Sequence, residues 1–376
     1  MTRVRAVALV LFGLVSCEGR AARRRPEPTV DPVSSAPLGP TLPVFPAATD
    51  APQPVRSGPL TFADLAARAD PAVVFIETEQ AMFGGGHRIV AGGVGTGFVF
   101  EPSGLILTNY HVVANATRIY ALFAEEDQKR ATVVGADAPT DVAVLHVDAK
   151  GLPHLPLGDS DSARVGDWVV AIGNPFSLSH TVSAGILSAK GRTRSDVRGL
   201  DPTGYYDYLQ TDASINPGNS GGPLLDLAGR VIGINTAIKP EANSIGFAIP
   251  INMVRELLPA LLEHGKFRRS AIGAFVAAVK EEDRARLGLR DRAGSIVTQV
   301  FPGGPAARAG LKVDDVIVQF GDVARAGPDR LRWVSSVSGV GKRVRMLVVR
   351  DRRTVDLTVT LGELPEPADP APFVAP

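Results

Sequence analysis

The sequence predicts a mainly β protein with two folded units, because short apolar runs alternate with glycine-rich turns along most of its length. Between Leu60 and about Ile251, segments such as AVVFIET, GTGFVF, DVAVLHV and DWVVAIG each have the length and composition of a strand. Few stretches in this part suit a long helix, which favours an all-β barrel or sandwich. The chain has 376 residues, of which 45% are hydrophobic, so it is long enough for two domains plus tails.

A helix and a second, smaller β unit are predicted to follow. INMVRELLPALLEHG (251–265) has helical spacing; Asn252 is placed to cap its start, and Pro259 is expected to kink or interrupt it. Beyond it, SIVTQVF, DVIVQF, RVRMLVVR and TVDLTVTL predict strands, whereas GGPAARAG and PDRLRWVSSVSG predict short helices. This second unit is predicted at 270–363, and the Pro-rich residues 364–376 are predicted to form a loose tail.

The N-terminus has the features of a targeting signal. Arg3 and Arg5 precede the apolar run AVALVLFGLV, and the run is followed by the only cysteine of the chain, Cys17. A small residue followed by cysteine resembles the bacterial lipobox, which predicts a lipoprotein-type signal peptide at 1–17; ordinary cleavage nearby or an incidental buried cysteine are the alternatives. Residues 18–59 are rich in Pro, Ala, Arg and Ser and predict a disordered tether, whose arginines either contact anionic lipids or are simply solvated.

Composition argues against several other classes of protein. The net charge of +1 gives no reason to expect nucleic-acid binding. No run of about 18 or more apolar residues occurs, so no helix of ordinary length is predicted to span a membrane. With one cysteine, no disulfide can support the fold. No cluster of Cys, His and carboxylate residues indicates a metal, so we expect no cofactor.

The most informative short segment is INPGNSGGPLLDLAGRVIGIN, which contains Ser220 in a Gly-x-Ser-x-Gly pattern. In an α/β-hydrolase a helix and the other catalytic residues would follow the serine. Here a β-hairpin is predicted instead, and only His264 follows, which disfavours that fold. Upstream, LTNYHVV supplies His111 at the end of an apolar strand, and TDVAVLHV supplies Asp141 at the start of another. The order His111, Asp141, Ser220 is that of chymotrypsin-type proteases.

These residues form a candidate catalytic triad. Ser220 would attack a peptide carbonyl, His111 would accept and return the proton, and Asp141 would hold the imidazole tautomer. The N–H groups of Gly218 and Ser220 are predicted to form the oxyanion hole, with Asn219 shaping the loop between them. Taken singly, each residue is as easily explained as a turn, surface or capping residue; their order and flanking motifs favour the triad.

Several motifs resemble, in order, those of the HtrA family of serine proteases, which includes DegP, DegQ and DegS. They are GTGFVFEPSGLILTNYHVV, TDVAVLHV, LPLGDSDSARVGDWVVAIGNPF, TVSAGILSAKGR, LQTDASINPGNSGGPLLDLAGRVIGINT and IGFAIPI. The resemblance covers about Phe62 to Glu363. It implies a chymotrypsin-like double β-barrel protease domain at 60–265 and a single PDZ domain at 270–363. It also implies a cofactor-free serine endopeptidase that degrades unfolded or damaged envelope proteins in the periplasm. The alternatives are a chaperone or peptide-binding scaffold, and a narrow regulatory protease gated by its PDZ domain.

The resemblance also implies further site residues. Ile215 and Ile238 would line an apolar primary pocket suited to small or medium aliphatic side chains, although core packing also explains Ile215. Arg192 would relay signals from the PDZ domain, or is a solvated loop arginine. Relatives form trimers through the N-terminal part of the protease domain, where Phe62 is a candidate contact, so a homotrimer is expected.

The PDZ domain would bind C-terminal peptides by adding them to a sheet edge. Ile272, Gly273 and Ala274 would form the loop that holds the peptide carboxylate. Ala274 and Phe320 depart from the family pattern, which leaves open a purely structural role for this domain.

Overall fold

The computed structural model describes residues 61–84, 87–123, 127–173, 181–197, 200–216, 218–236 and 245–365. The predicted signal peptide with Cys17, the tether and most of the predicted C-terminal tail lie outside these described residues. Within the described part of the chain, no helix is long and apolar enough to cross a membrane.

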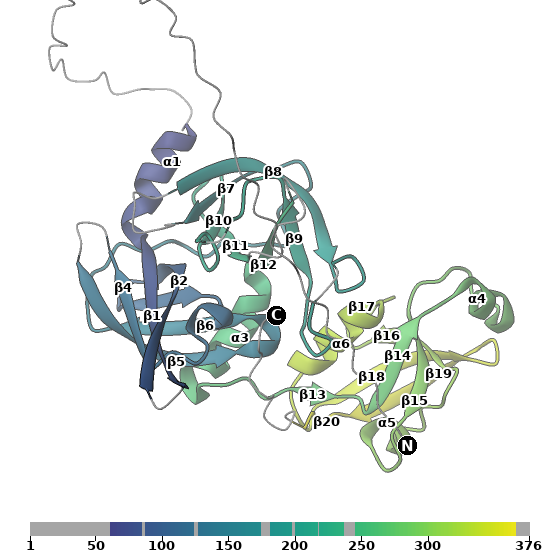
Figure 1. The fold of residues 1–376 in the computed structure, drawn as a ribbon. Helices are drawn as coiled ribbons and strands as arrows, with labels where there is room; N and C mark the ends of the chain where they lie inside the picture. Colours follow the sequence, from purple (N-terminus) through teal and green to yellow (C-terminus); the bar gives the residue numbers. More distant parts are fainter. Residues whose placement is uncertain are drawn as a thin grey trace, which may run out of the picture. The chain divides into compact units, whose positions relative to one another are not determined.

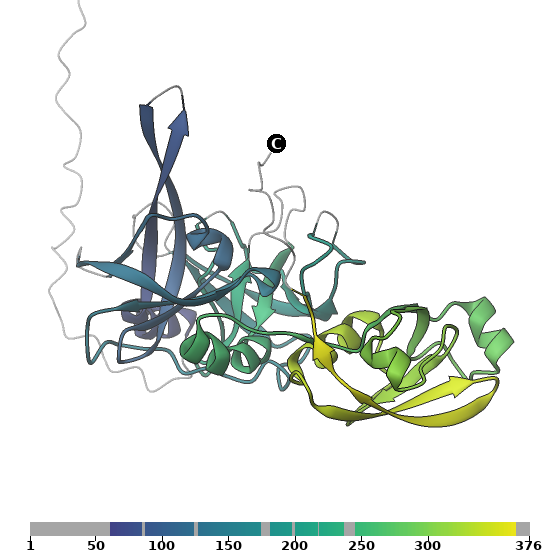
Figure 2. The same ribbon diagram turned by 90° about the horizontal axis from the view of Figure 1, so that it is seen from below.

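Two closed antiparallel β-barrels follow one another along the chain (Figure 1). The strands of the first barrel are β1 Val73–Gly84, β2 His87–Glu101, β3 Leu105–Thr108, β4 Arg118–Leu122, β5 Gln128–Asp137 and β6 Val142–Val147. The strands of the second are β7 Trp168–Gly173, β8 Thr181–Arg192, β9 Tyr208–Thr211, β10 Pro223–Asp226, β11 Val231–Thr236 and β12 Gly246–Pro250. Figure 2 shows the first two strands, in purple and blue, continuing beyond the first barrel as a two-stranded ribbon. The mainly β, double-barrel fold predicted from the sequence is confirmed.

Short helices precede the first barrel, lie between its strands and follow the second barrel. They are α1 Phe62–Ala69, η1 Asp70–Ala72, α2 Tyr110–Val113, η3 Ala138–Thr140 and α3 Ile251–His264. The prediction of one continuous strand through LTNYHVV was wrong: β3 ends at Thr108, and His111 lies in α2. In α3, Pro250 rather than Asn252 occupies the N-cap position, and the helix runs without interruption through Pro259.

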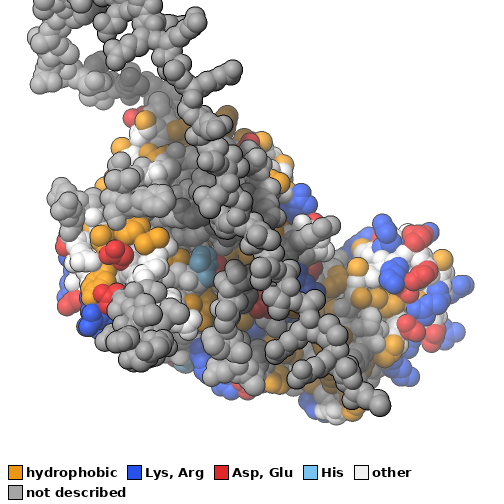
Figure 3. Space-filling view, in the orientation of Figure 1, with side chains coloured by type: hydrophobic (Ala, Val, Ile, Leu, Met, Phe, Trp, Pro, Cys, Tyr) orange, Lys and Arg blue, Asp and Glu red, His pale blue; other side chains and the backbone are white. Residues whose placement is uncertain are grey.

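The C-terminal unit is a small sheet with flanking helices. Its elements are β13 Ser270–Ala271, β14 Ala274–Ala278, α4 Glu281–Leu287, β15 Ser295–Val300, α5 Pro305–Arg308, β16 Val316–Phe320, β17 Val323–Ala324, α6 Pro328–Val337, β18 Arg343–Arg350, β19 Arg353–Thr360 and β20 Gly362–Glu363. The main sheet has the order β14-β15-β16-β18-β19, and β13 pairs separately with β20. Figure 3 shows basic and acidic side chains intermixed over the surface of this unit, where several exposed ion pairs form.

Buried apolar side chains form the interface between the two barrels. The largest core cluster combines side chains of the first barrel, such as Phe98 and Leu107, with Ile172 and Ile234 of the second barrel. Trp333 of α6 belongs to the same cluster, so the C-terminal unit shares a core with the barrels. This shared core positions the loops that carry the candidate catalytic residues.

The C-terminal unit also contains an ion pair with a buried carboxylate, which we expect to contribute to its stability. The Asp315 carboxylate, whose side chain is 1% exposed, accepts hydrogen bonds from Nε and Nη2 of Arg350 and from the backbone N–H of Lys312. Asp315→Ala would remove the carboxylate partner of Arg350, whose side chain is 22% exposed and keeps its hydrogen bond to Gly310 O, and should cost about 1–3 kcal/mol of stability. Native-state hydrogen exchange of the β16 and β18 amides measures this loss. Asp356→Ala, which removes the exposed partner of Arg345, is the control and should change exchange little. Equal effects of the two variants would contradict the prediction.

Candidate active site

Asp141 lies where η3 ends and β6 begins, in a left-handed backbone conformation with φ of +59°. Aspartate tolerates this conformation better than most residues do. The preceding turn is capped by Asp137, whose Oδ2 accepts the backbone N–H of Thr140 at 3.2 Å. The Asp141 N–H in turn donates to Ala138 O at 3.1 Å. These local hydrogen bonds therefore fix the backbone conformation at Asp141, and with it the position of its side chain.

The Asp141 carboxylate binds His111 through both the ring and the backbone of the histidine. The His111 Nδ1 atom lies 2.8 Å from Oδ2 and 3.0 Å from Oδ1, and the His111 backbone N–H donates to Oδ1 at 2.9 Å. An ionised carboxylate only accepts hydrogen bonds, so Nδ1 carries the proton. The neutral ring then has its lone pair on Nε2, the tautomer that a general base requires.

Groups around the pair hold Asp141 in place. Its backbone carbonyl accepts the Tyr110 N–H and the Asn109 side-chain amide, each at 3.1 Å. From the second barrel, the hydroxyl of Thr236 donates to Oδ2 at 3.3 Å. Asp141 is thus fastened to the segment that carries His111 and to the opposite barrel.

Opposing effects act on the pKa of His111. Burial lowers it, but the hydrogen bond to Asp141 and the negative charge of that carboxylate raise it by more, so the pKa lies above its usual value near 6.5. The imidazole side chain is 49% exposed, so one part of the ring is open to solvent while the other faces Asp141.

Ser220 lies in a buried turn that is tied to the first barrel by Thr96. The Thr96 N–H donates to Ser220 O at 2.9 Å, and its hydroxyl donates to Gly218 O at 2.5 Å. Thr108, at the end of β3, donates its hydroxyl to Thr96 O at 2.7 Å. A side chain at Gly221 would collide with Thr96 and Thr108, which shows how closely the serine turn approaches the strand leading to His111. The structure therefore brings the Ser220 turn beside the residues that lead to His111.

The residues on either side of this serine are arranged as a tight turn. Gly218 has a φ of +108°, which glycine adopts without strain. The Asn219 N–H donates to Asn216 O at 2.9 Å, and its side-chain amide donates to Ser214 O at 3.2 Å. The backbone and side chain of Asn219 therefore both form hydrogen bonds within this loop.

Two further predicted site residues of the protease domain, Ile215 and Arg192, fall within the described part of the chain. Ile215 is partly buried and packs against Gly246 in β12, at the side of the second barrel. Arg192, at the end of β8, donates to the Gln210 side chain at 2.8 Å. Ile238 lies outside the described residues.

In the C-terminal unit, the predicted carboxylate loop joins β13 to β14. Ile272 is buried in the core of this unit, and Ala274 opens β14. Gly273 has a φ of +75°, and its carbonyl accepts the Phe301 N–H at 3.1 Å.

Sequence reasoning did not single out Thr96, Asn109 or Thr236. A signal was present for each, because they lie within the segments GTGFVF, LTNYHVV and GINT, which carry the family resemblance. Their partners are far away in the chain, so their function became visible only in the fold.

Comparisons with known proteins agree with this geometry. Residues 95–234 match the model of a trypsin-like peptidase domain, and residues 270–361 match that of a PDZ domain. The chain is therefore a two-barrel, trypsin-like peptidase domain followed by one PDZ domain. In a superposition with the structure of the HtrA-type protease AlgW with decapeptide, identity is 37% and the TM-score is 0.69, over 82% of this chain and 100% of the other. The chain belongs to the HtrA family of proteases.

Curated relatives are longer. The probable periplasmic serine endoprotease DegP-like of Chlamydia trachomatis is 40% identical over 274 residues, which are 72% of this chain and 54% of the relative. A protein of the same name from Rickettsia conorii is also 40% identical, over 71% of this chain and 53% of the relative. The chain thus spans about half the length of these relatives.

The pKa of His111 predicts how peptidase activity depends on pH. Because a base must be neutral and Asp141 raises this pKa, kcat/KM should rise with pH with a midpoint above about 6.5. Asp141→Asn should lower that midpoint and reduce kcat by roughly 10⁴-fold, since the tautomer is no longer fixed. A pH series of peptide hydrolysis measures both. An unchanged midpoint in Asp141→Asn would contradict the assignment.

Thr96 offers a second test of the site. Thr96→Val removes the hydroxyl that binds Gly218 O while keeping the shape of the side chain, so the serine turn should loosen and kcat should fall by roughly 10- to 100-fold. Thr96→Ser keeps the hydroxyl and should recover most of the activity. Steady-state kinetics distinguishes them, and equal activity of the two variants would exclude this function of the hydroxyl.

Proposed function

We propose that this protein is a serine endopeptidase that cleaves unfolded or damaged proteins by a His111–Asp141–Ser220 triad. The observation that carries the proposal is the double contact of the Asp141 carboxylate with His111, beside a serine turn that Thr96 binds from the first barrel. Family membership and the names of the relatives support the same chemistry.

The proposed mechanism begins with attack of Ser220 Oγ on the peptide carbonyl. His111 Nε2 accepts the serine proton and later passes it to the leaving amine, while Asp141 stabilises the imidazolium. The N–H groups of Gly218 and Ser220 would bind the developing oxyanion, with Asn219 keeping their loop in shape. Water then hydrolyses the acyl-enzyme by the reverse sequence of proton transfers.

We also propose how substrates are selected. Ile215 and Ile238 would form an apolar pocket for small or medium aliphatic side chains. The PDZ domain would bind C-terminal peptides at the loop of Ile272, Gly273 and Ala274, and Arg192 would transmit that binding to the active site. The AlgW structure is that of a protease with a decapeptide, which supports peptide binding in this family.

The proposed location is the periplasm-facing cell envelope, with lipid attached at Cys17. The names of the relatives support a periplasmic protein. A homotrimer is proposed through the N-terminal part of the protease domain. In support, the rings of Phe62 and Trp168 lie 5.4 Å apart, and both side chains are exposed, Trp168 by 50%.

Cleavage of a permanently unfolded model protein by residues 19–376 tests the proposal. Ser220→Ala should reduce cleavage by roughly 10⁴-fold or more, because the nucleophile is gone. Ser103→Ala, which changes a serine on an exposed turn, should cleave normally. Gel analysis and fluorophosphonate labelling provide the readouts.

Cleavage that persists in Ser220→Ala would contradict the triad. If no form cleaves, labelling of Ser220 in the presence of hydrophobic C-terminal peptides would identify an enzyme in a resting state. Suppression of aggregation without labelling would instead support the scaffold alternative.

A further inference from the structure

A buried ion pair includes Asp137, which caps the turn that leads to the candidate catalytic aspartate, Asp141. Arg269 and Asp137 have side chains that are 8% and 4% exposed. Nη1 of Arg269 donates to Oδ1 of Asp137 and Nη2 donates to Oδ2, both at 2.6 Å. This is the bidentate arrangement that fixes the orientation of a carboxylate as well as its position. It joins residues 132 positions apart in the chain.

The same carboxylate caps the turn that leads to Asp141. Its Oδ2 accepts the hydroxyl of Thr140 at 2.5 Å and the backbone N–H of that residue at 3.2 Å. Arg269 therefore holds the Asp137 side chain, which in turn holds η3, and the next residue is Asp141 in its left-handed conformation. A rotation of the Asp137 carboxylate would release the N-cap of η3.

A second contact holds the same turn from the other side. The Tyr205 N–H donates to Pro139 O at 2.7 Å. The guanidinium carbon of Arg269 lies 4.6 Å from the centre of the Tyr205 ring, and that of Arg332 lies 4.1 Å from it. The turn before Asp141 is thus held at two points, by the Asp137 cap and by the hydrogen bond to the Pro139 carbonyl. Asp137 and Tyr205, which make these two contacts, both contact Arg269.

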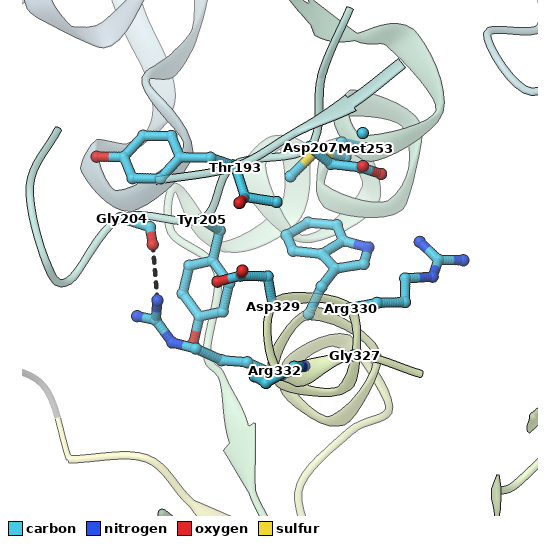
Figure 4. A pocket seen from close by; sticks show the side chains of 13 residues that line it. Thr193, Gly204, Tyr205, Asp207, Met253, Gly327, Asp329, Arg330 and Arg332 are labelled. Carbon is cyan, nitrogen blue, oxygen red and sulfur yellow. Dashed lines mark hydrogen bonds between the residues drawn. The ribbon is translucent and has the colours of Figure 1, made fainter. Parts of the chain in front are cut away.

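The PDZ domain contributes to this arrangement. Figure 4 shows Arg332 of α6 beside Tyr205 and hydrogen-bonded to Gly204 O, at 2.7 Å. Arg269 itself directly precedes β13, and its carbonyl accepts the N–H of Leu364 at 2.9 Å, after the last strand of the PDZ domain. The residue that orients Asp137 is therefore also bound to the segment that directly follows the last strand of the PDZ domain.

We propose that Asp137 and Arg269 are positioning residues for the catalytic carboxylate of Asp141. They act through the capped turn 138–140 and keep Asp141 in the conformation that meets Nδ1 of His111. Since the Arg269 carbonyl is bound to Leu364, directly after the last strand of the PDZ domain, this geometry requires an intact junction between the two domains. The inference rests on the proposed triad. A buried ion pair that serves the fold alone is the competing explanation.

Arg269→Met tests the proposal in the full-length mature protein, with kcat, KM and the pH profile normalised to the Ser220 sites that a fluorophosphonate titrates. We expect kcat to fall about 10- to 100-fold with little change in KM, because the reacting groups are misplaced while the substrate still binds. The midpoint of the acid limb should move to lower pH, since Asp141 no longer raises the pKa of His111. Burial raises the pKa of the nearby phenols Tyr206 and Tyr208, so they stay protonated in this range.

Matched variants distinguish positioning from folding. Arg268→Met removes the adjacent arginine, whose exposed pair with Glu363 is also bidentate, through Nε and Nη2, and should leave kcat and the midpoint unchanged. Arg269→Lys keeps the charge and should recover part of kcat. If Arg269→Met does not fold, the double variant Asp137→Asn, Arg269→Met removes both charges, while the amide that replaces the carboxylate retains an oxygen that can cap the turn.

The outcomes are separable. The inference is overturned if Arg269→Met or the double variant folds and shows a normal kcat per titrated site with an unchanged midpoint. It is also overturned if both of these variants fail to fold while Arg269→Lys has the kcat and midpoint of the wild-type protein. If the wild-type protein has no titratable Ser220, the proposed function itself fails. A reduced kcat with a shifted midpoint supports the inference.

Discussion

The contact between the two barrels at Thr96 is the constraint on which the candidate site depends. His111 and Asp141 belong to the first barrel and Ser220 to the second, so no local sequence can hold the three together. Thr96 N–H and hydroxyl bind both ends of the serine turn, and Thr108 fixes Thr96 from the strand that leads to His111. The shared apolar core holds the two barrels against each other, and these polar contacts fix the position of the serine turn relative to the first barrel.

Asp141 forms most of the other hydrogen bonds that hold the candidate site together. Its carboxylate binds the ring and backbone of His111, while its carbonyl accepts hydrogen bonds from Tyr110 and Asn109, in the segment that carries His111. These contacts fix the orientation of the carboxylate against the imidazole, which a general-base histidine requires. The opposing effects on the pKa of His111 follow from the same arrangement, because burial and the Asp141 charge both arise from placing the ring against this loop.

Much of this was accessible from the sequence, and the rest was not for physical reasons. Alternating apolar runs indicated the barrels, and the chain order of three residues indicated the triad. The strand at His111 was predicted too long because Val112 and Val113 are apolar and β-branched, yet they face the first-barrel core from a helical turn. At the start of α3, the Asn252 side chain bonds Asp159 rather than capping the helix. These outcomes depend on partners distant in the chain, which no window of sequence contains.

Three buried side-chain atoms of the described residues have no hydrogen-bond partner within the protein. Within the described residues they are Asn109 Oδ1, Asn235 Oδ1 and Arg269 Nε. Each belongs to a residue that supports one member of the candidate triad. Asn109 precedes the turn of His111, Asn235 bonds the backbone of Gly221 beside Ser220, and Arg269 binds the cap before Asp141. Unsatisfied buried groups are costly, and each of these three residues uses its other polar atoms to hold a segment of the candidate triad: Asn109 binds Asp141, Asn235 binds Gly221 and Arg269 binds Asp137.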